Sequence, residues 1–152
     1  MVDRLDIEVT GFEFLSAIDR AASQLEKPGA LMKLIGATME ENINLRFITK
    51  TDPSGNPWLP LAPATLARKK GRGSILELSG HGKSSLGYNL GVDGSFVEVG
   101  FGERYMGYHE TGTQRMPRRQ TLTDDFNAGT LGAQDQADIL QDIEAFLRDR
   151  GL

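Results

Sequence analysis

Apolar residues recur at helical spacing in three stretches of the chain. After Gly11 the first stretch continues to Lys27-Pro28-Gly29, where proline cannot continue a helix and glycine frees the backbone. Residues 29–48 carry an apolar residue at every fourth position, which predicts a long amphipathic helix. Residues 134–150 repeat the pattern and predict a closing helix that Gly151 ends. The apolar positions of the second stretch are Leu31, Ile35, Met39, Ile43 and Phe47.

Alternating apolar and polar residues predict strands in two places. Residues 5–10 alternate over a short span, which is typical of one strand. The clearest hairpin lies at 86–101, where Asp93-Gly94 predicts a two-residue type I′ turn and Ser95 begins the return strand. Pro63 starts a predicted short helix over 63–70. A brief helix is expected over 103–110, with its end at Gly112.

The order of these elements predicts an α+β fold, with a small antiparallel sheet packed against long helices. No internal repeat is evident, so residues 1–152 are expected to form a single domain. Two segments carry mostly turn residues or few apolar anchors. These are the loop 49–62, which contains the apolar Trp58-Leu59-Pro60-Leu61 run, and the arm 111–133. We expect both to be extended and partly mobile.

Composition excludes several classes of site and location but does not change the predicted fold. The chain of 152 residues has 18 glycines and no cysteine, which favours many turns and excludes disulfides and cysteine-based metal sites. No run of about 18 uncharged apolar residues is present, so no membrane partner is expected. The first six residues are neither basic nor followed by an apolar run, so we expect no signal peptide and a cytoplasmic address.

The net charge of −4 is unevenly distributed. Between residues 68 and 83 the chain carries the basic segment 68–72 and Lys83 but one acid, Glu77. Residues from Asp124 onward carry seven acids and two arginines. Opposed charges of this kind favour head-to-tail contacts between copies. Three alternatives stay open for segment 68–72: a solvated loop, a docking patch for an acidic partner, or a nucleic-acid-binding module that contacts phosphates.

Candidate catalytic motifs are weak. Gly82-Lys83-Ser84 resembles the end of a phosphate-binding loop, but Glu77 stands where that loop needs a glycine. His81 and His109 are the two histidines, and neither has the spacing of a zinc site or of a nucleophile motif. We therefore expect no catalytic residue, no metal, no cofactor and no enzyme activity. A hydrolase using either histidine is the remaining enzymatic hypothesis.

Several strings, in order, resemble a known family. Residues 52–61 (DPSGNPWLPL) resemble the P-x-G-x-x-W-x-P-L loop of the Mu-like phage virion morphogenesis proteins, also called tail completion proteins, and follow a basic-aromatic pair at Arg46-Phe47. Thr65 with Lys69 is similar to the family's T-x-x-x-K helix, and residues 76–80 to its L-x-x-S/T-G turn. The family's v-G-x-x-x-x-Y-a-x-x-H-x-x-G and P-x-R strings are matched by Val99-Gly100, Tyr105, His109 and Gly112, and by Pro117-Arg118-Arg119.

The resemblance implies a structural phage protein that completes or caps the tail and takes part in head–tail joining. It implies a virion location in the tail or neck after assembly in the host cytoplasm, usually as a ring of copies. Its expected partners are tail and neck proteins, and the resemblance also implies proximity to DNA. Tryptophan and arginine dominate interface energies, so the predicted partner interface consists of Trp58, Leu61, Arg68, Lys69, Lys70, Arg115, Arg118 and Arg119.

Overall fold

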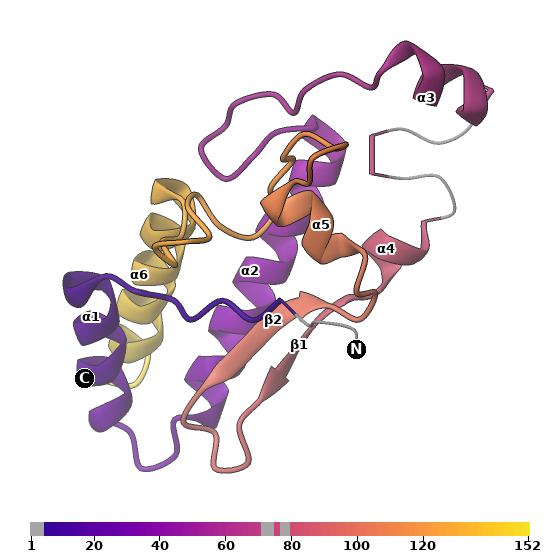
Figure 1. Cartoon of the computed structure of the whole chain (residues 1–152). Coiled ribbons are helices and arrows are strands. Elements are labelled where there is room, and N and C mark those ends of the chain that lie inside the picture. The colour runs from indigo at the N-terminus through magenta and orange to yellow at the C-terminus, as the bar shows by residue number, and fades with distance from the viewer. Residues whose placement is uncertain (1–4, 71–74, 77–79) are drawn as a thin grey trace.

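The structure is a computed structural model that describes residues 5–70, 75–76 and 80–152. Its fold is α+β, with a two-stranded antiparallel hairpin among helices (Figure 1). In chain order the elements are α1 (Phe12–Ser23), α2 (Gly29–Thr49), α3 (Pro63–Lys69), α4 (His81–Ser84), β1 (Leu86–Leu90), β2 (Val97–Phe101), α5 (Met106–Thr111) and α6 (Ala133–Arg148).

Helix α2 is the central element, because both strands of the hairpin and α6 pack against it, while α1 packs against α6. The hairpin pairs Leu86 with Phe101 and Leu90 with Val97. At Gly36 the helix surface is bare, and a Cβ there would lie 2.7 Å from the Tyr88 ring. The absence of a side chain at this position is therefore what lets the hairpin approach the helix closely.

Three stripes at four-residue spacing run along α2, and each faces a different environment. The core stripe is the predicted one and is buried: Leu31, Ile35, Met39, Ile43 and Phe47. The polar stripe, Thr38, Asn42 and Arg46, faces α6. The outer stripe, Ala37, Glu41 and Leu45, is exposed, and Ile48 extends it toward the end of the helix. Because apolar residues lie on both the core and outer sides, the helix is less amphipathic than the core pattern alone suggests.

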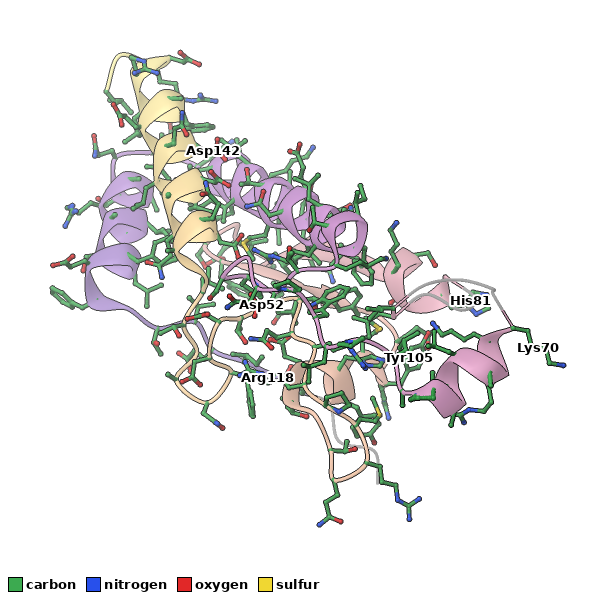
Figure 2. The ribbon with its side chains drawn as sticks, turned by 90° about the horizontal axis from the view of Figure 1, so that it is seen from above. Asp52, Lys70, His81, Tyr105, Arg118 and Asp142 are labelled. Carbon is green, nitrogen blue, oxygen red and sulfur yellow. The ribbon has the colours of Figure 1, made fainter. Side chains whose placement is uncertain are left out.

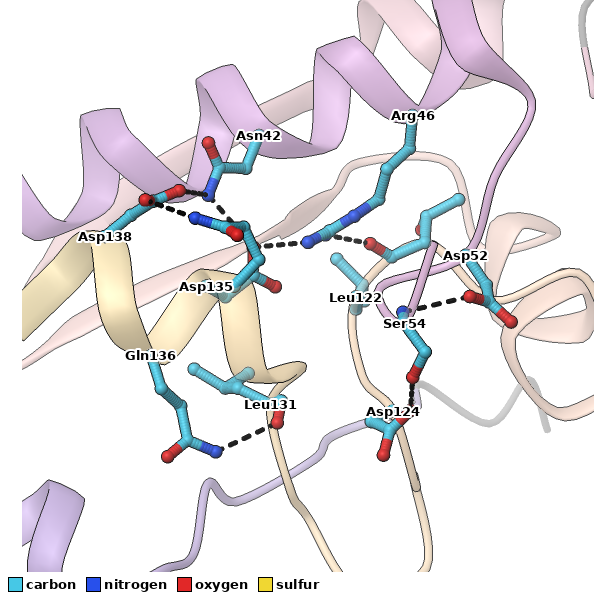
Figure 3. A network of polar contacts seen from close by, with 12 residues as sticks. Asn42, Arg46, Asp52, Ser54, Leu122, Asp124, Leu131, Asp135, Gln136 and Asp138 are labelled. Carbon is cyan, nitrogen blue, oxygen red and sulfur yellow. Dashed lines mark hydrogen bonds and ion pairs between the residues drawn. The ribbon is translucent and has the colours of Figure 1, made fainter. Parts of the chain in front are cut away.

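The polar stripe binds three acids of α6 in antiparallel order, and Figure 3 shows the contacts of Asn42 and Arg46 with Asp135 and Asp138. The Thr38 hydroxyl donates to Asp142, Asn42 Nδ2 donates to both Asp135 and Asp138 at 3.0 Å, and the Arg46 guanidinium forms an ion pair with Asp135. Asp135 is fully buried and Arg46 is 6% exposed. We call this set of contacts the α2–α6 ladder. From the sequence we expected these acids to contact the basic segment 68–72 of another copy.

The predicted strand at residues 5–10 is wrong. This segment is extended, but it belongs to no strand. Its end is held by the turn at 125–130 instead, since Thr10 N donates to Gly129 O at 2.9 Å and Thr10 Oγ1 to Ala128 O at 2.6 Å. Gly129 has φ of +75°, and a Cβ there would collide with Glu8 O. An irregular turn offers too short a run of backbone groups to complete a sheet ladder.

The predicted helices 12–27, 29–48, 63–70, 103–110 and 134–150 are confirmed, with α5 beginning later, at Met106, and ending before Gly112 (φ 72°). The hairpin is confirmed, but its predicted type I′ turn is wrong. Such a turn needs positive φ at both central residues, and Asp93 does not have it. Gly94 N donates to Gly91 O instead, and Gly91 N to Phe96 O, so the connection is longer. None of the helices in the described residues combines the length and apolar character that a membrane span needs.

Replacing Arg46 with alanine should destabilise the fold strongly, because it leaves the buried Asp135 carboxylate without its ion-pair partner. Loss of one partner of a buried pair typically costs about 3–5 kcal/mol. Urea unfolding followed by circular dichroism measures this loss. The double variant Arg46→Met/Asp135→Leu should recover much of the stability, since no charge then remains buried. Equal stability of Arg46→Ala and the parent would contradict a structural role for the pair.

Candidate interaction surface

The loop after α2 is anchored by Trp58, which is 5% exposed. Its ring meets Phe47 edge-on, with ring centroids 5.7 Å apart. Its Nε1 donates a hydrogen bond to Gln120 O at 2.9 Å. The indole therefore has both an apolar environment and a polar partner, as a buried tryptophan requires. It joins the loop to the core and to the chain after α5.

Arg119 makes the same connection from the other side. Its Nε donates to Leu59 O at 2.7 Å and its Nη2 to Pro60 O at 2.9 Å, while its backbone N donates to His109 O at 2.8 Å. The residue is 6% exposed, and burial lowers its pKa. Two carbonyl oxygens at fixed spacing suit the planar fork of a guanidinium. Arg119 thus fixes the backbone just before α3.

Glu110 holds the centre of this region, although no residue pattern singled it out as an interaction site. Its carboxylate is 1% exposed and accepts hydrogen bonds from the backbone N of Thr121, Leu122 and Thr123 at 2.8 to 3.0 Å, and from the Thr123 hydroxyl at 2.6 Å. Arg46 Nη1 donates to Thr121 O at 2.7 Å from the opposite side. These contacts hold residues 118–123, which we call the 118–123 segment.

The rest of the arm is also tied to the body. Arg118, half-buried, donates to Glu110 O at 2.8 Å and to Asp124 O at 3.1 Å, and its guanidinium lies 5.0 Å from the Phe126 ring centroid. Ser54 donates to Asp124 and so links the loop to the arm (Figure 3). The two segments expected to extend toward partners therefore make many contacts with one another and with α2. Their mobility stays a prediction.

The predicted interface residues separate into two groups. Trp58 and Arg119 are buried and Arg118 is half-buried, and all three make contacts within the chain. Leu61 and Lys69 are half-buried, whereas Arg68, Lys70 and Arg115 are exposed. Figure 2 shows Lys70 pointing away from the rest of the chain at the outer end of α3. Arg72 lies outside the described residues.

Helix α3 stands away from the body in Figure 1, and none of its residues is buried. Leu66 is 56% exposed, and Leu59, just before the helix, is equally so. Arg68 donates a hydrogen bond to Thr65 Oγ1 at 3.3 Å within the same helix. Trp58 and Arg119 hold the loop that leads into α3, and beyond it a basic and apolar helix is presented to solvent.

The candidate catalytic strings do not converge. Gly82-Lys83-Ser84 forms most of the single helical turn α4, and Glu77 lies outside the described residues. His81 is exposed on α4, whereas His109 is half-buried on α5. Within the described ranges, no three histidine, aspartate or glutamate side chains lie close enough together to hold a metal ion.

Sequence reasoning missed Glu110, Asn42, Arg46 and Asp135, which carry the polar contacts. The ladder residues had a readable signal. Thr38, Asn42 and Arg46 recur every fourth residue on one helix, and Asp135, Asp138 and Asp142 recur three and four residues apart on another. Such spacing places each set on one helix face. Glu110 had no comparable signal, because its partners are backbone amides.

Changing Glu110 to glutamine should destabilise the protein by roughly 2–3 kcal/mol, because the amide loses charge-assisted hydrogen bonds and turns an NH2 group toward backbone donors. Urea unfolding measures the loss, and amide hydrogen exchange should show faster exchange at Thr121 and Thr123. Trp58, the single tryptophan, reports by fluorescence whether the loop is released. Glu103→Gln, at an exposed position, is the matched control. Unchanged exchange in the 118–123 segment would refute this role.

His109 makes stability sensitive to pH. Burial lowers its pKa from the ordinary 6.5, and the positive charges of Arg119 and Lys69 lower it further. Its buried Nδ1 has no hydrogen-bond partner among the described residues. The folded state therefore binds fewer protons than the unfolded state, so stability is present above pH 6.5 and falls as the pH drops from there toward the lowered pKa.

His109→Gln should remove the part of the stability loss between pH 7 and pH 5 that comes from this group. Urea midpoints measured at half-unit intervals check it. His81→Gln, at the exposed histidine, should keep the parental slope. A slope that is identical in the parent and in His109→Gln would contradict the assignment.

Comparison with protein families matches residues 10–147, nearly the whole chain, to the phage virion morphogenesis family. No curated protein and no solved structure gives a significant match. The match spans the α2–α6 ladder, Glu110 and α3. The family points to a structural rather than a catalytic role, in virion assembly. The chain belongs to the phage virion morphogenesis family.

Proposed function

We propose that the chain completes or caps the phage tail and takes part in joining it to the head, acting by association with its own copies and with tail and neck proteins. The observation that carries this proposal is α3, a basic helix with exposed Leu66 that stands away from the body of the chain and lies within the family match. An exposed apolar side chain surrounded by charge is typical of protein interfaces. The chain would act in the tail or neck of the particle, after assembly in the host cytoplasm.

The interface proposed from the sequence changes its emphasis here. Trp58 and Arg119 support the proposal indirectly, because they fix the approach to α3. Arg68 and Lys70, together with Leu66, are the groups that a partner can reach first. Arg115, exposed in the turn after α5, is a second point of contact. Leu61, Lys69 and Arg118 are half-buried and so partly accessible.

Replacing Leu66 with glutamate should leave folding stability within about 0.5 kcal/mol, since the position is exposed. It should nevertheless lower the yield of joined particles roughly tenfold, because a charge would enter an apolar contact. The test complements a phage or prophage that lacks the gene and counts joined particles by electron microscopy. Val92→Glu, at an exposed apolar residue in the hairpin turn, is the matched control. Normal particle yield without the gene would refute the proposed function.

The nucleic-acid alternative makes a different prediction for the same helix. Phosphate contacts by Arg68 and Lys70 would give DNA binding that weakens steeply with salt. On our proposal the purified chain shows no such binding across a salt series, consistent with its net charge of −4. Micromolar, salt-dependent binding that Arg68→Glu/Lys70→Glu abolishes, with particle joining intact, would favour the alternative.

A further inference from the structure

A groove of about 450 Å³ runs along the outer stripe of α2, beside the hairpin. Its lining includes Glu40, Glu41, Asn44, Leu45, Ile48 and Tyr88. A second hollow of about 280 Å³ shares Glu40 and Asn44 and continues toward α4. We call the two together the α2 groove. Helix α3 contributes no residue to either hollow.

The α2 groove combines exposed apolar side chains with acids. Ile48 is 70% exposed and Leu45 is 50% exposed, which is unusual for large aliphatic residues at adjacent positions of one helix face. Glu40 and Glu41 form no ion pair within the described part of the chain. Lys83 lines the second hollow, so the first hollow, with its two acids beside Leu45 and Ile48, is the part that fits an apolar and basic occupant.

Helix α3 has the complementary character. Leu66 and Lys70 lie four residues apart, so they share one side of the helix and its end. Arg68 projects from another side of the helix and raises its overall positive charge. The helix is about 10 Å long at 1.5 Å per residue, and helices pack with axes about 8–10 Å apart, so an open groove on α2 can take it. Trp58 and Arg119 hold the approach to α3 against the 118–123 segment, which restrains it from folding back.

We infer that α3 of one copy docks in the α2 groove of the next copy. The inference rests on the proposed function, since it names the self-contact through which that assembly occurs. The two surfaces differ, so the contact is heterologous, and its repetition closes a ring or extends a filament. Leu66 packs on Leu45 and Ile48, while Lys70 faces Glu40 and Glu41.

Charge reversal tests the contact. Glu40→Lys/Glu41→Lys changes the net charge from −4 to 0, and Arg68→Glu/Lys70→Glu changes it from −4 to −8, because each substitution shifts the charge by two. Each pair should weaken self-association at least tenfold in sedimentation equilibrium, since like charges would then meet. The fourfold variant, again at −4, should recover most of it. Glu26→Lys/Glu144→Lys, at exposed positions and also at net charge 0, should associate like the parent.

The absence of cysteine allows a second measurement. Under mild oxidation, Leu66→Cys/Ile48→Cys should give a ladder of disulfide-linked multimers. Leu66→Cys/Leu140→Cys, with Leu140 on the exposed side of α6, should give none beyond random dimers. A crosslink confined to monomers would show that α3 binds its own groove and would overturn the inference.

Three further results would also overturn it: a parent chain that is monomeric at its highest soluble concentration, groove variants that associate like the control, or a fourfold variant that does not recover. In each of these cases the chain can still be required for particle joining, and the proposed function then stands without this contact. If particles join normally without the gene, the proposed function fails whatever the association data show.

Discussion

The Arg46 guanidinium is the contact on which the rest of the structure depends. It joins three segments that are distant in sequence, because it binds Asp135 of α6 and the Thr121 carbonyl while belonging to α2. A buried charge is tolerated only when its partners are in place. Helix α2, helix α6 and the 118–123 segment must therefore form together, and Glu110 holds the amide side of the same segment whose carbonyl Arg46 binds.

This arrangement decides which groups remain for other molecules. Trp58 and Arg119 are residue types that interfaces favour. Their side chains instead donate hydrogen bonds to backbone carbonyls inside the chain. Three acids of α6, Asp135, Asp138 and Asp142, likewise bind the polar stripe of α2. Among the groups left exposed are the basic helix α3 and the acidic and apolar outer stripe of α2.

Periodicity was sufficient for five of the helices in the described residues and for the hairpin, because it is local and each element satisfies it on its own, but it did not predict the single helical turn α4. It failed at residues 5–10, where alternation was present but the neighbouring segment is a turn and not a strand. It also could not say that Trp58 and Arg119 point inward. Their partners are the carbonyls of Gln120, Leu59 and Pro60, and a carbonyl leaves no trace in side-chain patterns. Glu110 was invisible for the same reason.

The sequence prediction for α2 accounted for one of its two apolar sides and left the outer stripe unexplained. Residues 29–48 were assigned one apolar face, and that face is the core. Leu45 and Ile48 fall on the opposite side, where their apolar surface stays exposed to solvent in the monomer and does not stabilise its fold. A helix that is apolar on two sides has two apolar surfaces to cover, and the folded chain covers one. The second surface makes physical sense when an apolar and basic element covers it, and α3 of a neighbouring copy is such an element.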